Sequence, residues 1–327
     1  EILQLIQGDG AGFEAVALAV FEHQYQRCAP YRRLADAQGR APGAVSSWRD
    51  IPAIPIEAFR TVELRGFEAA ETQAVFHSSG TTAERSTHAF DTLALYRAAA
   101  LAGARQALFP SGARRVVSLI PGADVRPDSS LSYMVTWILE ELAAPDSVVD
   151  TTGAAALCGV PALILGTAFG LASWLEGQPG PRLPPGTAIM ETGGFKGRHR
   201  ELSRAALFAL YAAAGVPAER VVGEYGMAEL SSQWWDGVVG LGVEASGRVY
   251  SPPPWARTRV VDPATRADVA PGEVGLLLHL DVVNRGSVQA VLTQDLGERV
   301  VGERDGFVYR GRASRAVLKG CGLLDEP

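Results

Sequence analysis

The stretch "RRVVSLIPGADVRPDSSLSYMVTWILEELA", residues 114–143, decides the fold class of this chain. Its first part, Arg114–Pro121, is an apolar run of strand length, which predicts a buried strand. After a connection rich in Gly, Asp and Pro, Ser129–Ala143 has apolar residues at helical spacing, and Ser129 or Ser130 can serve as its N-cap. A buried strand followed by a helix that covers it is the repeating unit of an α/β sheet.

Strand-like and helix-like segments alternate on both sides of this stretch. Apolar residues recur at helical spacing in residues 14–26, 93–108, 169–175 and 200–214. Apolar runs of strand length are "DSVVD" (146–150), "PALILGT" (161–167), "GTAIMETGG" (186–194) and "ERVVGEYG" (219–226). This alternation predicts an α/β fold in which helices are layered on a sheet.

The pattern changes at about residue 246. The strand candidates beyond it are short and are separated by Gly, Asp and Pro turns. They are "GRVYSPPPWARTRVVD", "GEVGLLLHLDV", "SVQAVLTQD", "ERVVG" and "GFVYRG". We therefore expect residues 1–245 to form an α/β core and residues 246–327 to form a β-rich closing subdomain of the same domain.

Composition excludes several classes of partner. The 327 residues carry a net charge of −6 and no basic stripe, which argues against nucleic-acid binding. No apolar run is long and unbroken enough to span a bilayer. The three cysteines are an odd and sparse set, typical of a reducing compartment, so we expect a soluble cytoplasmic protein. The sequence does not specify the oligomeric state.

A run of small polar residues follows the apolar segment "AVF". It consists of Ser78, Ser79, Gly80, Thr81 and Thr82. The glycine lets the backbone bend, and the hydroxyls can donate hydrogen bonds, so the segment can surround a phosphate. It does not have the Walker A pattern. The alternative is a plain polar loop.

Two carboxylates also stand at or near predicted strand ends, where open α/β sheets collect ligands. Glu229 follows "EYGMA" and is either a Mg²⁺ ligand or a solvated charge or cap. Asp295 in "TQD" either accepts hydrogen bonds from a ribose diol or begins the turn "DLG". These alternatives stay open at the level of residue pattern.

Three further features have a functional and a structural interpretation. Gly193 and Gly194 either let a flat ring or an acyl group approach the backbone or form a simple turn. Arg312 is either a surface charge or a ligand for phosphate or ribose. Cys321, between glycines and near Lys319, is either an accessible thiol or a small buried apolar residue. We find no zinc-binding constellation.

Taken in order, these motifs resemble those of the adenylate-forming enzymes, the superfamily of acyl- and aryl-CoA ligases. The matching pieces are "SSGTT" (78–82), "GG" (193–194), "EYGMAE" (224–229), "TQD" (293–295) and "GR" (311–312). "SSLSYM", "ETGGFKGR" and the ending "GRASRAVLKGCGLL" are similar to the acyl-protein synthetase branch, which is close to the phenylacetate-CoA ligase-like proteins. The resemblance implies the large-domain architecture of adenylate-forming enzymes, with layered αβ sheets and a β-rich C-terminal subdomain.

The resemblance also implies a role for each motif. The loop 78–82 would hold the β- and γ-phosphates of ATP, and Gly193 and Gly194 would border the acyl and adenine pockets. Glu224, Tyr225, Gly226 and Met227 would line adenine. Glu229 would hold Mg²⁺, and Asp295 would bind the ribose hydroxyls with Arg312 nearby. A carboxylic acid would be the substrate, and Cys321 or an acyl-carrier or other acyl-accepting protein would take the acyl group.

The sequence departs from the superfamily pattern in three places. The usual Gly and Lys after "TT" are replaced by Ala83 and by Glu84–Arg85, where Arg85 can supply the positive charge. The hinge position that is often Asp is Ser314. The sequence ends at Pro327, so we expect the small domain that carries the catalytic lysine of the superfamily to be absent.

Three functions therefore remain open. The first is ATP-dependent acyl activation followed by transfer to a thiol or an amine. The second is an acyltransferase or condensing enzyme on the same fold, which uses a preformed thioester without ATP. The third is a non-catalytic scaffold that binds a nucleotide or an acyl group.

Overall fold

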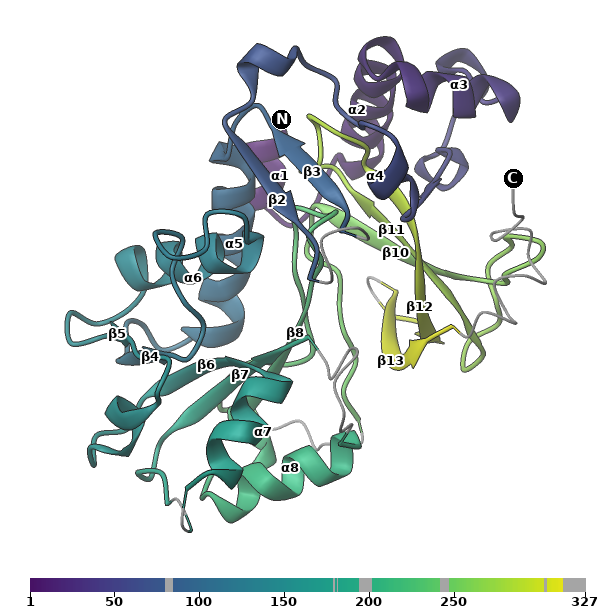
Figure 1. Cartoon of the computed structure of the whole chain (residues 1–327). Coiled ribbons are helices and arrows are strands. Elements are labelled where there is room, and N and C mark those ends of the chain that lie inside the picture. Colours follow the sequence, from purple (N-terminus) through teal and green to yellow (C-terminus); the bar gives the residue numbers. More distant parts are fainter. Residues whose placement is uncertain are drawn as a thin grey trace. The chain divides into compact units, whose positions relative to one another are not determined.

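A computed structural model describes residues 1–79, 85–178, 180, 182–193, 202–241, 247–302 and 305–313. The chain divides into two compact units (Figure 1). The first unit contains residues 1–99, 227–232 and 249–327, and the second contains residues 100–226 and 233–248. The long helix α5 (Ala94–Leu108) begins in the first unit and ends in the second.

The second unit is built on a six-stranded sheet with the strand order β5-β4-β6-β7-β8-β9. Strands β4 to β8 pair in parallel, and β9 pairs with β8 in the antiparallel direction. The strands are β4 (Val116–Ser118), β5 (Val148–Val149), β6 (Leu163–Thr167), β7 (Ala188–Thr192), β8 (Val221–Tyr225) and β9 (Trp234–Trp235). The helices are α6 (Ser130–Glu141), α7 (Ala168–Glu176) and α8 (Arg204–Ala213), with 3-10 turns at Ala154–Leu157 and Ala218–Arg220.

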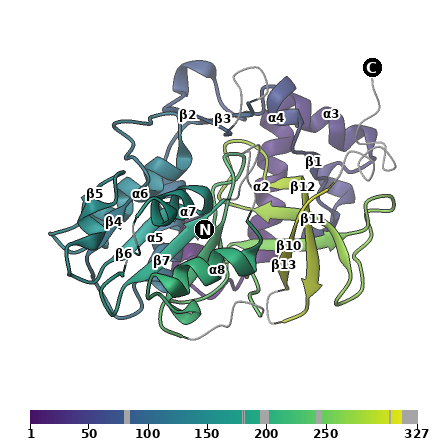
Figure 2. The same ribbon diagram turned by 60° about the horizontal axis from the view of Figure 1, so that its bottom comes forward.

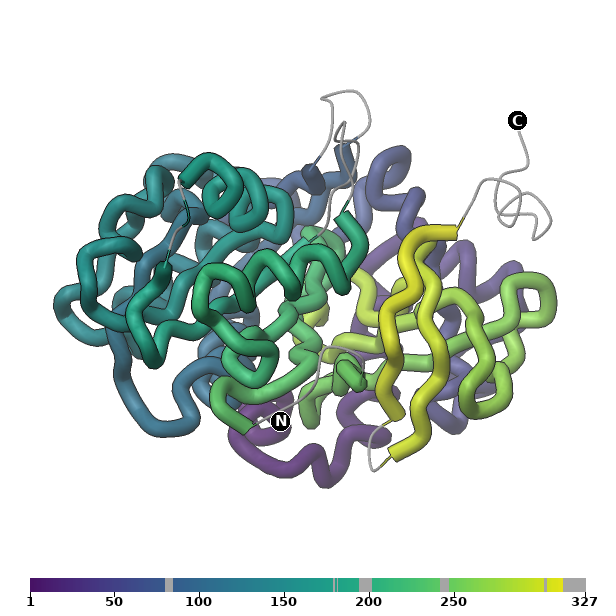
Figure 3. Tube along the Cα trace, turned by 90° about the horizontal axis from the view of Figure 1, so that it is seen from below, coloured from purple at the N-terminus to yellow at the C-terminus, as the bar shows by residue number. Residues whose placement is uncertain are grey.

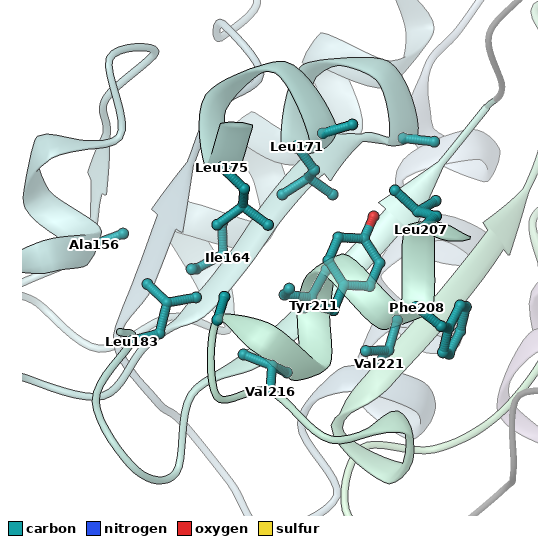
Figure 4. Packing of buried hydrophobic residues seen from close by; sticks show 14 of the residues in the cluster. Ala156, Ile164, Leu171, Leu175, Leu183, Leu207, Phe208, Tyr211, Val216 and Val221 are labelled. Carbon is teal, nitrogen blue, oxygen red and sulfur yellow. The ribbon is translucent and has the colours of Figure 1, made fainter. Parts of the chain in front are cut away.

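Helices cover both faces of this sheet. Figure 1 draws α7 and α8 on one side and α6 on the other. Figure 4 shows the apolar layer on the α7–α8 side, where Leu171 and Leu175 of α7 and Tyr211 of α8 pack against Ile164. The strands are apolar because both faces are buried, as expected of parallel sheets. The predicted α/β layering is confirmed, and Ser129 caps α6 by accepting a hydrogen bond from Ser132 N.

The first unit combines N-terminal helices with antiparallel strands. Its helices are α1 (Ile2–Gln7), α2 (Phe13–Arg27), α3 (Ala29–Ala37) and α4 (Ala58–Thr61), with 3-10 turns at Pro42–Ala44, Trp48–Asp50 and Ala69–Glu71. Its strands are β1 (Ile54–Pro55), β2 (Ala74–His77), β3 (Thr87–Phe90), β10 (Ala256–Val261), β11 (Val274–Asp281), β12 (Ala290–Val300) and β13 (Gly306–Arg312). Strands β2 and β3 form a separate hairpin, and the others form a sheet in which β12 pairs with β1, β11 and β13.

The β-rich C-terminal region is confirmed, but one detail of its prediction is wrong. The segments "SVQAVLTQD" and "ERVVG" are parts of one strand, β12, which is eleven residues long. Figure 3 shows β12 beside β13 at the yellow end of the colour scale. Asp295 therefore lies within a strand and does not begin a turn.

The proposed linear division at residue 245 stays a prediction. The first unit contains residues 1–99 together with the C-terminal strands, and the second unit ends at residue 248. Among the helices that the structure describes, none has the length and apolar character needed to cross a membrane.

Candidate functional site

The carboxyl ends of β7 and β8 bring two predicted motifs together. Thr192 and Glu224 are partners in the parallel register, and the Thr192 hydroxyl donates a hydrogen bond to Glu224 Oε2. Glu224 is only 5% exposed. Burial raises the pKa of Glu224 to about 7, and the Thr192 hydrogen bond opposes that shift. The motif therefore contains a carboxyl group that titrates near neutral pH.

The two described glycines of these motifs are required for different reasons. A Cβ at Gly226 would collide with Glu224 Oε1, so the glycine leaves room for the folded-back Glu224 side chain. Gly193 has a φ of +68°, a left-handed conformation that favours glycine, and a Cβ there would meet nothing within 4 Å. Tyr225, which directly precedes Gly226, packs its ring edge-on against Trp234, with the ring centroids 6.2 Å apart. The backbone after each strand is thus shaped for an exposed turn.

The raised pKa of Glu224 predicts a pH-dependent stability. A carboxyl group with a folded-state pKa near 7 and an ordinary value of 4.5 favours folding below pH 4.5, and this contribution is lost as the pH rises through 7. Glu224→Gln removes the titration and keeps an acceptor for Thr192. We expect the free energy of unfolding of the variant to gain up to about 3 kcal/mol relative to wild type between pH 5 and pH 8.

Urea denaturation at pH 5, 6, 7 and 8 measures this difference. Glu219→Gln, which changes an exposed carboxylate, is the control and should show a constant offset from wild type. Parallel stability curves for Glu224→Gln and wild type would contradict the raised pKa.

The segment that carries Glu229 is fixed by side chains from distant parts of the first unit. His88 Nδ1 donates to Ala228 O at 2.8 Å, and Asn284 Nδ2 donates to Glu229 O at 2.8 Å. Asp281 Oδ2 accepts a hydrogen bond from Ser231 N at 2.9 Å. These contacts hold the backbone of the segment that carries Glu229.

The Glu229 residue is largely buried. It is 4% exposed, and the hydrogen bond from Asn284 Nδ2 goes to its backbone carbonyl and not to its carboxylate. A largely buried carboxylate is stabilised by a nearby positive charge, so a cation is a chemical group that fits it. Within the described residues no group of three or more His, Cys, Asp and Glu can hold a metal. A single carboxylate suits Mg²⁺, which takes its other oxygens from water and phosphates.

Asp295 and Arg312 face each other on neighbouring strands. They are register partners on β12 and β13, and Arg312 Nε lies 3.3 Å from Asp295 Oδ1. Asp295 is 5% exposed, whereas the Arg312 side chain is 40% exposed. Thr293, which accepts from Asp295 N at 3.0 Å and donates to Leu277 O at 2.9 Å, fixes the strand at this point. The pair can offer carboxylate oxygens and a guanidinium to one polar ligand.

The structure describes the two ends of the hydroxyl-rich loop. Ser78 N donates to Ser86 O at 3.1 Å, and Ser86 N donates to Ser78 Oγ at 2.9 Å. Arg85 Nε donates to Ser78 O at 2.7 Å. Ser78 therefore closes the base of the loop, and Ser79 beyond it is exposed. Gly80, Thr81 and Thr82 lie outside the described residues, as do Gly194 and Cys321.

The predicted residues are thus distributed over both units. The first unit contains Ser78, Ser79, Met227, Glu229, Asp295 and Arg312, and the second contains Gly193, Glu224, Tyr225 and Gly226. A hydrogen bond connects Thr192 with Glu224, and an ion pair connects Arg312 with Asp295. Gly226 is the last residue of its segment in the second unit, and the next residue, Met227, belongs to the first unit.

Sequence reasoning missed a buried charge network in the second unit. Asp236 accepts hydrogen bonds from Gly223 N at 2.6 Å, from Arg248 Nη1 at 2.9 Å and from Arg204 Nη2. Tyr211, labelled in Figure 4, donates to Glu191 Oε2 at 3.1 Å. Burial raises the pKa of Glu191, and Arg204 opposes this. The sequence offers a weak signal for this network. Glu191 stands near the end of an apolar strand, and Asp236 directly follows another apolar segment.

Comparisons with known proteins agree with the predicted fold. Residues 9–131 match the model of the family described as acyl-protein synthetase, LuxE. No curated protein matches the sequence. Among solved structures, 2-hydroxyisobutyryl-CoA ligase in complex with 2-HIB-AMP and CoA matches with a TM-score of 0.71 and 18% identity, over 94% of this chain and 68% of that chain. An ATP-bound MatB from Rhodopseudomonas palustris matches with a TM-score of 0.52 and 15% identity, over 84% and 56%.

At identities this low, the structural matches demonstrate the fold alone. This fold is the one predicted from the motifs. The family match adds a sequence relation over residues 9–131, which include the hydroxyl-rich loop. Residues 9–131 are thus similar to the acyl-protein synthetases, and the chain has the fold of the solved CoA ligases.

Proposed function

We propose that this protein activates a carboxylic acid with ATP to form an acyl-adenylate and then transfers the acyl group to a thiol or an amine. The observation that carries the proposal is Glu229, which is only 4% exposed and whose backbone is held in place by Asn284. It stands in the motif "EYGMAE" of a chain with the fold of the adenylate-forming ligases.

The reaction does not require a nucleophile from the protein. It requires that the protein hold two anions, the carboxylate of the acid and ATP, in the correct relative position. The carboxylate of the acid attacks the α-phosphate of ATP, and pyrophosphate leaves. A Mg²⁺ ion held by Glu229 would neutralise charge on the phosphates. The loop 78–82 would donate hydrogen bonds to the β- and γ-phosphates, where hydroxyl and backbone N–H donors stabilise the developing charge.

The other site residues would orient the nucleotide. Asp295, whose side chain is held by Arg312, would accept hydrogen bonds from the ribose hydroxyls. Residues 224–227 would line adenine, and Glu224 is held away from solvent by Thr192. These roles need fixed geometry, because correct orientation supplies much of the rate enhancement of such a reaction.

The strand order of the second unit supports a position for the acyl group. The order β5-β4-β6 reverses the direction of chain progress between β4 and β6, and ligands of α/β sheets collect at such a switch point. Helices α6 and α7 follow these two strands in sequence. We place the acyl pocket at residues 131–137, 168–174 and 193–195, where aromatic and small side chains are mixed and suit a fatty or an aryl acid.

Exchange of radiolabelled pyrophosphate into ATP, with a panel of fatty and aryl acids, tests the proposal. We expect exchange that depends on both the acid and Mg²⁺. The second candidate function, an ATP-independent acyltransferase, is favoured by the residues Ala83 and Glu84–Arg85 in the phosphate loop. Turnover of a preformed thioester, with no exchange and no nucleotide binding by calorimetry, would support that candidate and contradict adenylation.

Incubation of the protein with ATP and a radiolabelled acid identifies the acyl acceptor. We propose Cys321, or the thiol of a carrier protein, as this acceptor. Cys321→Ser should lose a hydroxylamine-labile label on the protein and retain exchange. Cys158→Ser removes an exposed free thiol elsewhere and is the matched control. Label that persists in Cys321→Ser would assign the acceptor to another group.

A further inference from the structure

The first unit contains a cavity of about 390 Å³ that none of the motifs above explains. It lies between the end of α3, the segment 49–55 and the sheet, and its apolar lining includes Ile51, Leu278 and Leu292. Figure 2 shows α3 and β1 next to the strands β11 and β12. The volume is within the range of small-molecule sites.

This cavity is on the opposite face of the sheet from the proposed ribose site. Leu292 and Leu296 of β12 belong to one apolar cluster, and Asp295 directly precedes Leu296 in the strand, so its side chain points to the other face. Leu292 and its register partner Leu278 line the cavity. A ligand here would therefore be separate from the nucleotide held by Asp295.

Four arginines line the cavity: Arg40, Arg49, Arg259 and Arg266. Three of them are paired. Arg40 Nη1 lies 2.8 Å from Asp50 Oδ1, and Asp268 is shared by Arg49 at 2.8 Å and Arg259 at 2.6 Å. Positive groups thus outnumber the carboxylates that pair with them.

Arg266 is the exception. Its Nη1 atom is buried and has no hydrogen-bond partner among the residues that the structure describes. The charge of Asp262 attracts Arg266, and Asp262 Oδ1 accepts hydrogen bonds from Ala264 N, Thr265 N and Thr265 Oγ1. Arg266 also has a φ of 62°, an unfavourable backbone conformation for a residue other than glycine. A strained turn that places a guanidinium with an unsatisfied Nη1 atom in the wall of a cavity is suited to an incoming oxyanion.

We propose that this cavity binds a small amphipathic oxyanion. Its phosphate or carboxylate group accepts hydrogen bonds from Arg266, and its apolar part covers Leu278 and Leu292. Both oxyanions match the planar fork of a guanidinium. The site is independent of the proposed adenylation reaction.

Isothermal titration calorimetry without ATP tests this site with phenyl phosphate, phenylacetate, inorganic phosphate and phenol. We expect saturable binding of at least one of the two aromatic oxyanions, tighter than that of inorganic phosphate or phenol. The tighter of the two identifies the head group. Arg266→Asn should weaken binding by about tenfold or more, because a hydrogen bond to a charged group is lost. Asparagine tolerates the left-handed conformation, so the melting temperature should be equal to that of wild type or higher.

Arg32→Asn is the matched control, because Arg32 is exposed on α3 and does not line the cavity. It should bind as wild type does. Absence of binding by wild type, or equal binding by Arg266→Asn, would overturn the proposal. If inorganic phosphate binds as tightly as phenyl phosphate and phenylacetate does not bind, the proposed contact between an apolar group of the ligand and the apolar lining would be overturned. None of these results depends on pyrophosphate exchange, which tests the adenylation reaction separately.

Discussion

Glu229→Gln is expected to reduce acid-dependent ATP–pyrophosphate exchange by roughly a hundredfold or more, because a metal ion contributes several kcal/mol of charge stabilisation to such a reaction. The substitution removes one negative charge and little volume. The backbone contacts from His88 and Asn284 do not involve the side chain and should remain. The melting temperature should therefore stay close to that of wild type, since the contacts that hold this segment are kept.

Calorimetric titration of ATP with and without Mg²⁺ gives a second measurement. Wild type should bind ATP more tightly with the metal, and Glu229→Gln should lose most of that difference. Glu219→Gln, an exposed carboxylate close in sequence, should keep both the exchange and the metal effect. A Glu229→Gln variant with unchanged exchange, or with a parallel loss of exchange and thermal stability, would contradict the role as a metal ligand.

Much of the fold was predictable because its determinants are local. Helical periodicity placed α2 and α5 to within a residue or two, and a serine followed by an apolar run identified the start of α6. Apolar runs of strand length located β6, β7 and β8, because both faces of a parallel sheet are buried.

The division of β12 into two strands failed for an identifiable reason. "DLG" has the composition of a turn, but Gly297 stands at a β-bulge between β12 and β13. A Cβ there would collide with the Leu277 side chain and lie 3.1 Å from Phe307 Cβ. The glycine is thus required by close packing within the strand, and composition cannot separate that cause from a turn.

The motif residues of the candidate site were predictable, but their supports were not. Glu229, Asp295 and Arg312 stand in recognisable short motifs. His88 and Asn284, which position Glu229, are 140 residues before Ala228 and 55 residues after Glu229 in the chain. Nothing in either segment indicates a partner, because such contacts follow from tertiary packing alone.

Asp236 is the support with the largest expected effect on stability. Asp236→Ala should lower the free energy of unfolding by about 3–5 kcal/mol, the cost of leaving buried charges unpaired. The Arg248 side chain is only 2% exposed and lies over the Phe208 ring, so it cannot turn to solvent without losing its packing. The substitution would also remove the acceptor of Gly223 N, directly before Glu224.

Urea denaturation of three variants separates charge from shape at this position. Asp236→Asn retains an acceptor for Gly223 N but loses the charge. Its free energy of unfolding should therefore lie between that of wild type and that of Asp236→Ala. Arg126→Ala breaks the exposed ion pair with Asp128, whose Nε–Oδ1 distance is 3.2 Å, and should cost less than about 1 kcal/mol. A loss for Asp236→Ala as small as that for Arg126→Ala would show that the buried arginines find other partners. A full loss in Asp236→Asn would show that the charge, rather than the hydrogen bond to Gly223, holds β8 in place.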